Sequence, residues 1–123
     1  MTEIKSSLLC RVAAIQMNSG DNKLNNLGAV ERLVNAAVSD HQANLVLLPE
    51  NFSLFDGSAA LELGREQATV SGDVRHFIAS LAARLKVWIV AGSIPCSVRP
   101  DGSAIADRVR SACWVFNDKG EEV

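Results

Sequence analysis

Three short, unbroken runs of apolar residues constrain the fold of this chain more than any other feature. They are Val12–Ile15, Leu45–Leu48 and Val87–Ala91. A strand that is buried on both faces has a continuous apolar sequence, whereas a strand with one solvated face alternates apolar and polar residues. The second run is stopped by Pro49 and the third by Gly92, which marks them as short elements. The sequence therefore predicts three strands of a parallel-rich sheet.

Two amphipathic segments separate these runs and predict the two main helices. The first begins after a polar cap at Asp21 or Asn22, and its apolar stripe comprises Leu24, Leu27, Val30, Val34, Ala37 and Val38. The second covers Asp73–Lys86, and its stripe comprises Val74, Phe77, Ile78, Leu81, Ala82 and Leu85. A short helix is predicted at Ser58–Leu63. This alternation of strands and helices is typical of the α/β class with right-handed crossovers.

The C-terminal part predicts a long loop and a hairpin. Cys96–Asp107 has the composition of a loop. Arg108–Phe116 is predicted to be a fourth strand, and Asn117–Gly120 is predicted to be a hairpin turn. Glu121–Val123 would begin the returning strand. Both main helices are expected to lie on one face of the sheet, which leaves the other face bare. The bare face and the short final strand together predict that residues 1–123 form part of a domain.

Composition excludes several classes of protein. The chain is 48% hydrophobic and 21% charged with a net charge of −2, which argues against disorder. The acidic balance and the lack of a basic run argue against nucleic acid as a partner. The longest apolar run, Val87–Ala91, is far shorter than the ~18 residues of a membrane span. Met1–Leu9 lacks the apolar core of a signal peptide, so we expect a cytoplasmic protein.

The histidines and cysteines do not have metal-ligand spacing, so no dedicated metal site is expected. His41 and His76 are isolated and are predicted to face solvent. Cys10 and Cys113 are predicted to be packing residues. The odd number of cysteines does not suggest a disulfide scaffold and agrees with a reducing compartment.

Glu50 is the most informative polar residue. It follows directly on the apolar strand Leu45–Leu48 and Pro49, at the carboxyl edge of the sheet, where ligands bind in open α/β folds. Desolvation beside an apolar strand end disfavours the charged form of a carboxylate and so raises its pKa. A raised pKa suits a general base. The alternative is structural: an acid at a strand end that accepts hydrogen bonds from the turn Asn51–Ser53. Both interpretations remain open from position alone.

Four segments resemble the nitrilase superfamily of carbon–nitrogen hydrolases, in the same order and at compatible spacing. They are Arg11–Met17, Asn44–Phe52, Val90–Pro95 and Arg108–Gly120, so the resemblance covers nearly the whole chain from Arg11. The run Leu-Pro-Glu-Asn-Phe that contains Glu50 is its most specific part. The pattern is most similar to the Nit-type amidase branch, which includes deaminated glutathione amidase and omega-amidase.

The resemblance implies a fold and a mechanism. The fold would be the N-terminal part of a four-layer α-β-β-α sandwich, with 1–123 an incomplete domain truncated at Val123. The family uses a Glu-Lys-Cys triad, in which Glu50 matches the general base, while the lysine and the cysteine would lie beyond Val123. The implied reaction hydrolyses a linear amide of a small carboxylic or keto acid and releases ammonia, without a cofactor. This chain alone would then be inactive, and the full-length form would be a homo-oligomer.

Three other readings compete with this one. In one alternative, Cys96, which follows Pro95 at the same sheet edge, forms a dyad with Glu50, although a packing role is commoner for such a cysteine. A non-catalytic remnant could act as a binding or dimerisation partner of intact homologues. A flavodoxin-like signalling domain is disfavoured because Gln16–Gly20 lacks an acid pair and no glycine-rich nucleotide loop occurs. Lys86 and Lys119, at a helix end and a turn, are predicted to be solvated.

Overall fold

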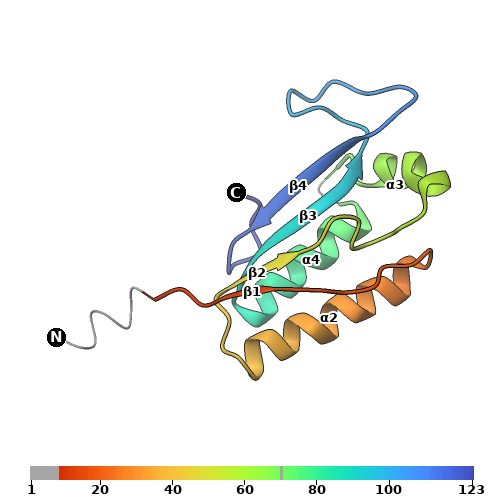
Figure 1. Ribbon diagram of the computed structural model, residues 1–123. Helices are drawn as coiled ribbons and strands as arrows, with labels where there is room; N and C mark the ends of the chain where they lie inside the picture. The colour runs from red at the N-terminus through yellow and green to blue at the C-terminus, as the bar shows by residue number, and fades with distance from the viewer. Residues whose placement is uncertain (1–8, 70) are drawn as a thin grey trace.

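The structure, a computed structural model, describes residues 9–69 and 71–123 (Figure 1). Met1–Leu8, which include most of the segment Met1–Leu9 that lacks the apolar core of a signal peptide, lie outside the described residues. The strands are β1 (Val12–Ala14), β2 (Leu45–Leu48), β3 (Trp88–Cys96) and β4 (Arg110–Phe116). The helices are α2 (Lys23–Ser39), α3 (Ala60–Glu66) and α4 (Asp73–Leu85), with a 3-10 turn η1 (Gly57–Ala59) before α3. No helix in these ranges is long and apolar enough to cross a lipid bilayer.

The four strands form one sheet in the order β1-β2-β3-β4. β1, β2 and β3 are parallel, and β4 is antiparallel to β3. This arrangement confirms the predicted α/β class and the parallel-rich sheet. The boundaries of β3 differ from the prediction, because the strand continues through Gly92 to Cys96. A β-bulge between Ala91 and Ile94 shifts the register, and β4 pairs with the residues beyond it.

Helices α2 and α4 lie on the same side of the sheet, as Figure 1 shows. Val30 and Val34 of α2 and Ile78 of α4 are fully buried in the core that they form against the sheet. Asn22 caps α2, since its side-chain oxygen accepts a hydrogen bond from the backbone N–H of Asn25. Leu24 was expected in the apolar stripe but is exposed; Asn26 and Leu27 occupy the buried face at that turn.

The opposite side of the sheet, here called the open face, carries apolar side chains that no described helix covers. Val12, Leu47 and Trp88 are 53%, 38% and 40% exposed. The strand register places Ala14, Leu47, Val90 and Val115 in one row across the sheet. The prediction that both main helices lie on one face is thus confirmed, and within residues 9–69 and 71–123 the other face is bare.

The open face has a measurable consequence for the isolated 123-residue chain. We expect the chain to self-associate and to bind a hydrophobic dye in its native state, because contiguous apolar patches of this kind associate in water. Replacing Leu47 and Trp88 together with glutamine should reduce dye fluorescence, whereas Leu24→Gln, at an exposed leucine of α2, should not. A monodisperse monomer that binds no dye would contradict this expectation.

The C-terminal residues fold back onto α4. Gly120 N–H donates to the carbonyl of Asn117 at 2.9 Å, which closes the predicted hairpin turn. Beyond the turn, Glu122 is bridged to Phe116 and pairs with Arg75 of α4 through two hydrogen bonds of 2.7 and 2.8 Å. The Arg75 guanidinium also lies 4.6 Å from the centre of the Trp114 ring. Sequence periodicity gave no sign of this buried arginine.

Candidate functional site

A cavity of about 350 Å³ lies at the carboxyl edge of the sheet. Its walls come from the segment after β2, from η1 and α3, and from the start of β4; they include Glu50, Asn51, Leu54, Leu63, Val109 and Arg110. Glu50 follows β2 after Pro49, which cannot donate a hydrogen bond to the sheet. The structure therefore places Glu50 at the strand end that the sequence predicts, and on the wall of a cavity.

The chain turns sharply immediately after Glu50. Asn51 has a φ of 53°, in the left-handed region that asparagine tolerates better than most residues. Its backbone N–H donates to the carbonyl of Ser93 in β3 at 3.0 Å. This bond attaches the residue after Glu50 to β3, and β2, which precedes Glu50, is itself paired with β3. The backbone that carries the carboxylate is therefore held both before and after Glu50.

The Glu50 side chain is exposed and accepts no hydrogen bond from a described residue. The alternative in which the turn Asn51–Ser53 donates to this carboxylate is therefore not observed among residues 9–69 and 71–123. The expected desolvation is not observed either, because the described residues leave the carboxylate in contact with solvent. What the chain provides is an accessible carboxylate on a firmly held backbone.

Asn26 of α2 connects the two loops at this edge. It is buried, and its amide accepts from Gly20 N–H and donates to the carbonyls of Gly20 and Ser53, each at 2.9 Å. These bonds join the loop after β1 to the loop after β2 that carries Glu50. Sequence reasoning missed this residue, although an asparagine beside Leu27 on the core side of a helix was the available signal.

Two further charged side chains line the cavity. Asp56 caps η1, and its carboxylate accepts hydrogen bonds from the Ser58 hydroxyl at 2.6 Å and the Ser58 N–H at 3.0 Å. These bonds to Ser58 hold the pKa of Asp56 below its usual value. Arg110 is half-buried, and its Nε donates to the carbonyl of Val98 at 2.7 Å.

The structure does not bring Cys96 to Glu50. Cys96 is 2% exposed, its thiol donates to the Val98 carbonyl at 3.4 Å, and it does not line the cavity that contains Glu50. Cys96 is the last residue of β3, and its side chain is buried in the interior of the protein. Cys10 and Cys113 are exposed, so the expected packing role is wrong for both. Cys113 is exposed because it lies on the open face of the sheet. Cys10 is exposed because it lies before β1, outside the sheet.

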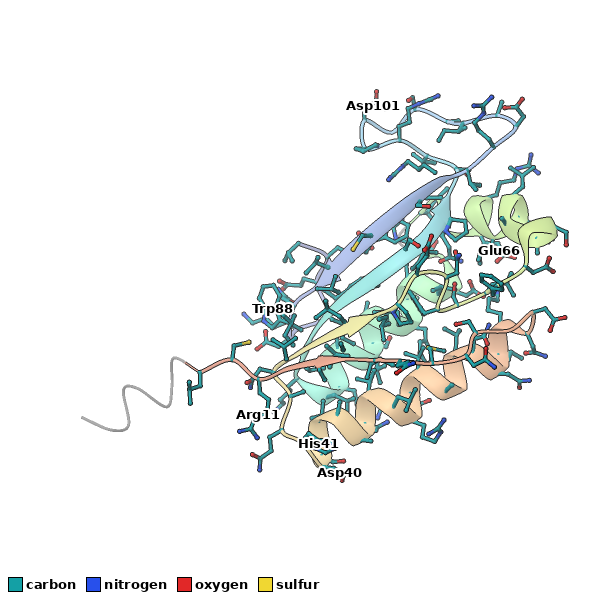
Figure 2. All side chains as sticks on the ribbon, viewed as in Figure 1. Arg11, Asp40, His41, Glu66, Trp88 and Asp101 are labelled. Carbon is teal, nitrogen blue, oxygen red and sulfur yellow. The ribbon has the colours of Figure 1, made fainter. Side chains whose placement is uncertain are left out.

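The remaining candidates lie away from the cavity. His41, His76, Lys86 and Lys119 are exposed, as the sequence predicts. Figure 2 shows His41 just beyond the end of α2, at the opposite end of the molecule from Glu66 in α3, and Asp101 on the long loop between β3 and β4. In the part of the chain that the structure describes, no three His, Cys, Asp or Glu side chains are grouped closely enough to hold a metal ion.

In open α/β proteins ligands bind at the carboxyl edge of the sheet, and in this chain both Glu50 and a cavity lie at that edge. The family model described as "Carbon-nitrogen hydrolase" matches residues 11–123. The chain belongs to the carbon–nitrogen hydrolase family.

Individual relatives agree with this assignment. The chain is 32% identical over 110 residues to the deaminated glutathione amidase of Yersinia enterocolitica, a match that covers 89% of this chain and 36% of the relative. It is 32% identical over 114 residues to nitrilase homolog 2 of Dictyostelium discoideum, which covers 92% of this chain and 32% of the relative. The chain thus spans about a third of the length of these curated relatives.

A solved structure confirms the fold. Nit3 of Saccharomyces cerevisiae, a member of the nitrilase superfamily, superposes with a TM-score of 0.76 at 23% identity. The superposition covers 92% of this chain and 41% of Nit3. The α/β architecture described above is therefore the one found in carbon–nitrogen hydrolases.

Proposed function

We propose that this chain provides the general base of a site that hydrolyses a linear amide of a small carboxylic or keto acid and releases ammonia. The observation that carries the proposal is the accessible Glu50 carboxylate at the end of β2, on the wall of the cavity. The relative named deaminated glutathione amidase supports amide hydrolysis as the reaction class.

The proposed mechanism requires two groups from outside these 123 residues: the cysteine nucleophile and the lysine that the family resemblance implies. Glu50 takes the proton of the cysteine thiol, and the thiolate attacks the amide carbon. The lysine ammonium stabilises the oxyanion of the tetrahedral intermediate. Glu50 returns the proton to the leaving nitrogen, ammonia departs, and water then hydrolyses the thioester with Glu50 again as base.

Hydrolysis should depend on Glu50. The 123-residue chain alone should release no ammonia from amides, because no cysteine lines the cavity with Glu50. In a protein that joins this chain to the remainder of its coding sequence, Glu50→Gln should lower kcat at least ~100-fold through loss of the general base. Glu62→Gln, at an exposed residue of α3, is the matched control and should keep full activity.

Two results would contradict the proposal. One is unchanged kcat in the Glu50→Gln protein. The other is Glu50-dependent turnover by the 123-residue chain, which would make Cys96 the nucleophile despite its burial. Reading the codons downstream of Val123 is a simpler first test, since the proposal requires a lysine on a strand and then a cysteine in a turn.

The open face favours a second candidate function. A non-catalytic chain with exposed Val12, Leu47 and Trp88 could bind an intact homologue or form a dimer through that face. Mixing the chain with a purified intact relative tests this role: binding that is lost on replacing Leu47 and Trp88 with glutamine would support it. A stop codon directly after Val123 would also favour this second function.

Self-assembly of the full-length protein into a homo-oligomer is proposed on the family resemblance.

A further inference from the structure

Arg75 of α4 is a charged residue in the interior of the protein. Its side chain is 9% exposed, and its Nε and Nη2 donate to the Glu122 carboxylate at 2.8 and 2.7 Å. An ion pair taken out of water loses hydration, and two apolar side chains of similar volume often stabilise a fold as well or better. The pair is therefore better suited to fixing one arrangement of the chain than to adding stability.

Three further contacts hold Arg75 in place. Its Nη1 donates to the Gln67 carbonyl at 3.0 Å, and its guanidinium lies 4.6 Å from the centre of the Trp114 ring. The side-chain oxygen of Gln67, a fully buried residue, accepts from the backbone N–H of Arg75 at 3.1 Å. Arg75 is thus a fixed point on α4 to which Glu122 is attached.

Glu122 lies among the residues that return along β4 after the hairpin turn. It is bridged to Phe116, and the N–H of Val123 donates to the carbonyl of Val115 at 2.9 Å. Residues that lie opposite each other on antiparallel strands have their side chains on the same face of the sheet. Phe116 is buried in the core, so the Glu122 side chain lies on the face that α2 and α4 cover, where it meets Arg75.

A shift of this register by one residue would break the pair. Because successive side chains of a strand point to opposite faces, the shift would turn Glu122 toward the open face and leave Arg75 buried without its partner. An uncompensated buried charge strongly disfavours that arrangement. The turn is closed by bonds from Gly120 N–H and Glu121 N–H to Asn117, which fix the residues next to it. The ion pair then fixes the register of the strand beyond the turn.

This register is important for the candidate site because β4 connects the hairpin to the cavity. β4 begins at Arg110, a residue of the cavity wall, and ends at Phe116, opposite Glu122. A strand that continues from Val123 in the same register would run antiparallel to β4 and reach the cavity wall.

We propose that Arg75 is a positioning residue for the hydrolysis: through Glu122 it sets the register of the strand that continues along β4, and so determines which side chains of that strand enter the cavity. The inference rests on the function proposed above, which requires a lysine on a strand beyond Val123. A lysine displaced by one position would point to the other face of the sheet, where its ammonium would not stabilise the oxyanion.

Separating catalysis from stability tests the proposal. In the protein that joins this chain to the remainder of its coding sequence, Arg75→Met combined with Glu122→Leu replaces the ion pair with two apolar side chains. This double variant should keep most of its thermal stability, because apolar groups need no partner. Its kcat should fall at least ~10-fold with KM unchanged, since a misplaced oxyanion donor weakens binding of the transition state alone. Arg84→Met combined with Glu31→Leu, at the exposed pair between α4 and α2, is the matched control and should change neither quantity.

Amide hydrogen exchange gives a readout that does not depend on catalysis. In the Arg75→Met, Glu122→Leu protein, peptides that contain residues 121–123 should exchange about tenfold faster, because the strand is no longer held in one register. Peptides from α2 should exchange as in the unsubstituted protein, and the control variant should match that protein in both regions. Mass spectrometry of the exchanged peptides measures both rates.

Three results would overturn the proposal. Full kcat in the Arg75→Met, Glu122→Leu protein would mean that the pair contributes packing only. A fall in kcat that accompanies an equal loss of thermal stability would assign Arg75 a structural role. Unchanged exchange at residues 121–123 would mean that the turn alone sets the register. The proposed function fails separately, through unchanged kcat in the Glu50→Gln protein, and faster exchange at residues 121–123 would still assign the register to Arg75.

Discussion

Gly92→Ala is expected to lower the free energy of unfolding by at least ~3 kcal/mol. Gly92 lies in the bulge of β3, where a Cβ atom would overlap the carbonyl oxygen of Leu48 and would lie 3.1 Å from the carbonyl carbons of Leu48 and Pro49. All three are backbone atoms, so no side-chain rotation relieves the overlap. Either β3 or the segment that carries Glu50 must move.

Urea denaturation followed by tryptophan fluorescence would measure this loss. Gly28→Ala is the matched control, because Gly28 lies in α2 with no atom within 4 Å of the added Cβ. The same substitution should there increase stability by ~1 kcal/mol, since alanine favours the helix. If both variants change stability in the same direction, that result would contradict the close approach of β3 to the end of β2.

Arg75→Met is expected to lower the free energy of unfolding by ~3 kcal/mol. The substitution leaves Glu122 without its partner and removes the bond from Arg75 Nη1 to the Gln67 carbonyl at 3.0 Å. Breaking a buried pair costs more than a surface pair, because the remaining charge stays partly desolvated. Glu122 is 28% exposed at its side chain, which relieves part of that penalty and places the expected value at the lower end of the range.

Two further variants separate the pair from general destabilisation. Arg84→Met breaks the exposed pair with Glu31 and should change stability by no more than ~0.5 kcal/mol. Combining Arg75→Met with Glu122→Leu should recover most of the loss, since two apolar groups need no partner. If the double variant is as unstable as the sum of its parts, the packing of Arg75 on Trp114 rather than its charge carries the effect.

Local sequence signals predicted most of the fold. The apolar runs at Leu45–Leu48 and Val87–Ala91 and the two helical stripes act over short distances, so they identify elements without knowledge of the tertiary structure. The sequence did not predict the end of β3, because glycine commonly interrupts strands and Gly92 therefore indicated an earlier stop. Here the absence of a side chain allows β3 to approach β2, and pairing with β4 continues the strand. That information lies in residues far along the chain.

For the candidate site as well, the sequence predicted the position of one residue and missed the others. Glu50 follows a buried strand and precedes a turn, and both signals are local. Asn26, Asp56 and Arg110 depend on contacts between segments that only the folded chain brings together. Asn26 meets Ser53 across 27 positions of sequence, and Arg110 reaches Val98 across 12. Periodicity does not contain such contacts, so a buried asparagine and a cavity arginine resemble ordinary polar residues in the sequence.

The position of Cys113 gives the molecule a natural chemical reporter. Its thiol is exposed on the open face, whereas the thiol of Cys96 is enclosed in the interior. The rate at which a maleimide alkylates Cys113, measured separately from that of the exposed Cys10 by peptide mass spectrometry, therefore reports whether anything covers that face, and Cys96 serves as the protected reference in the same molecule. Protection of Cys113 in a longer or assembled form would map the covering layer onto β4 without an introduced label.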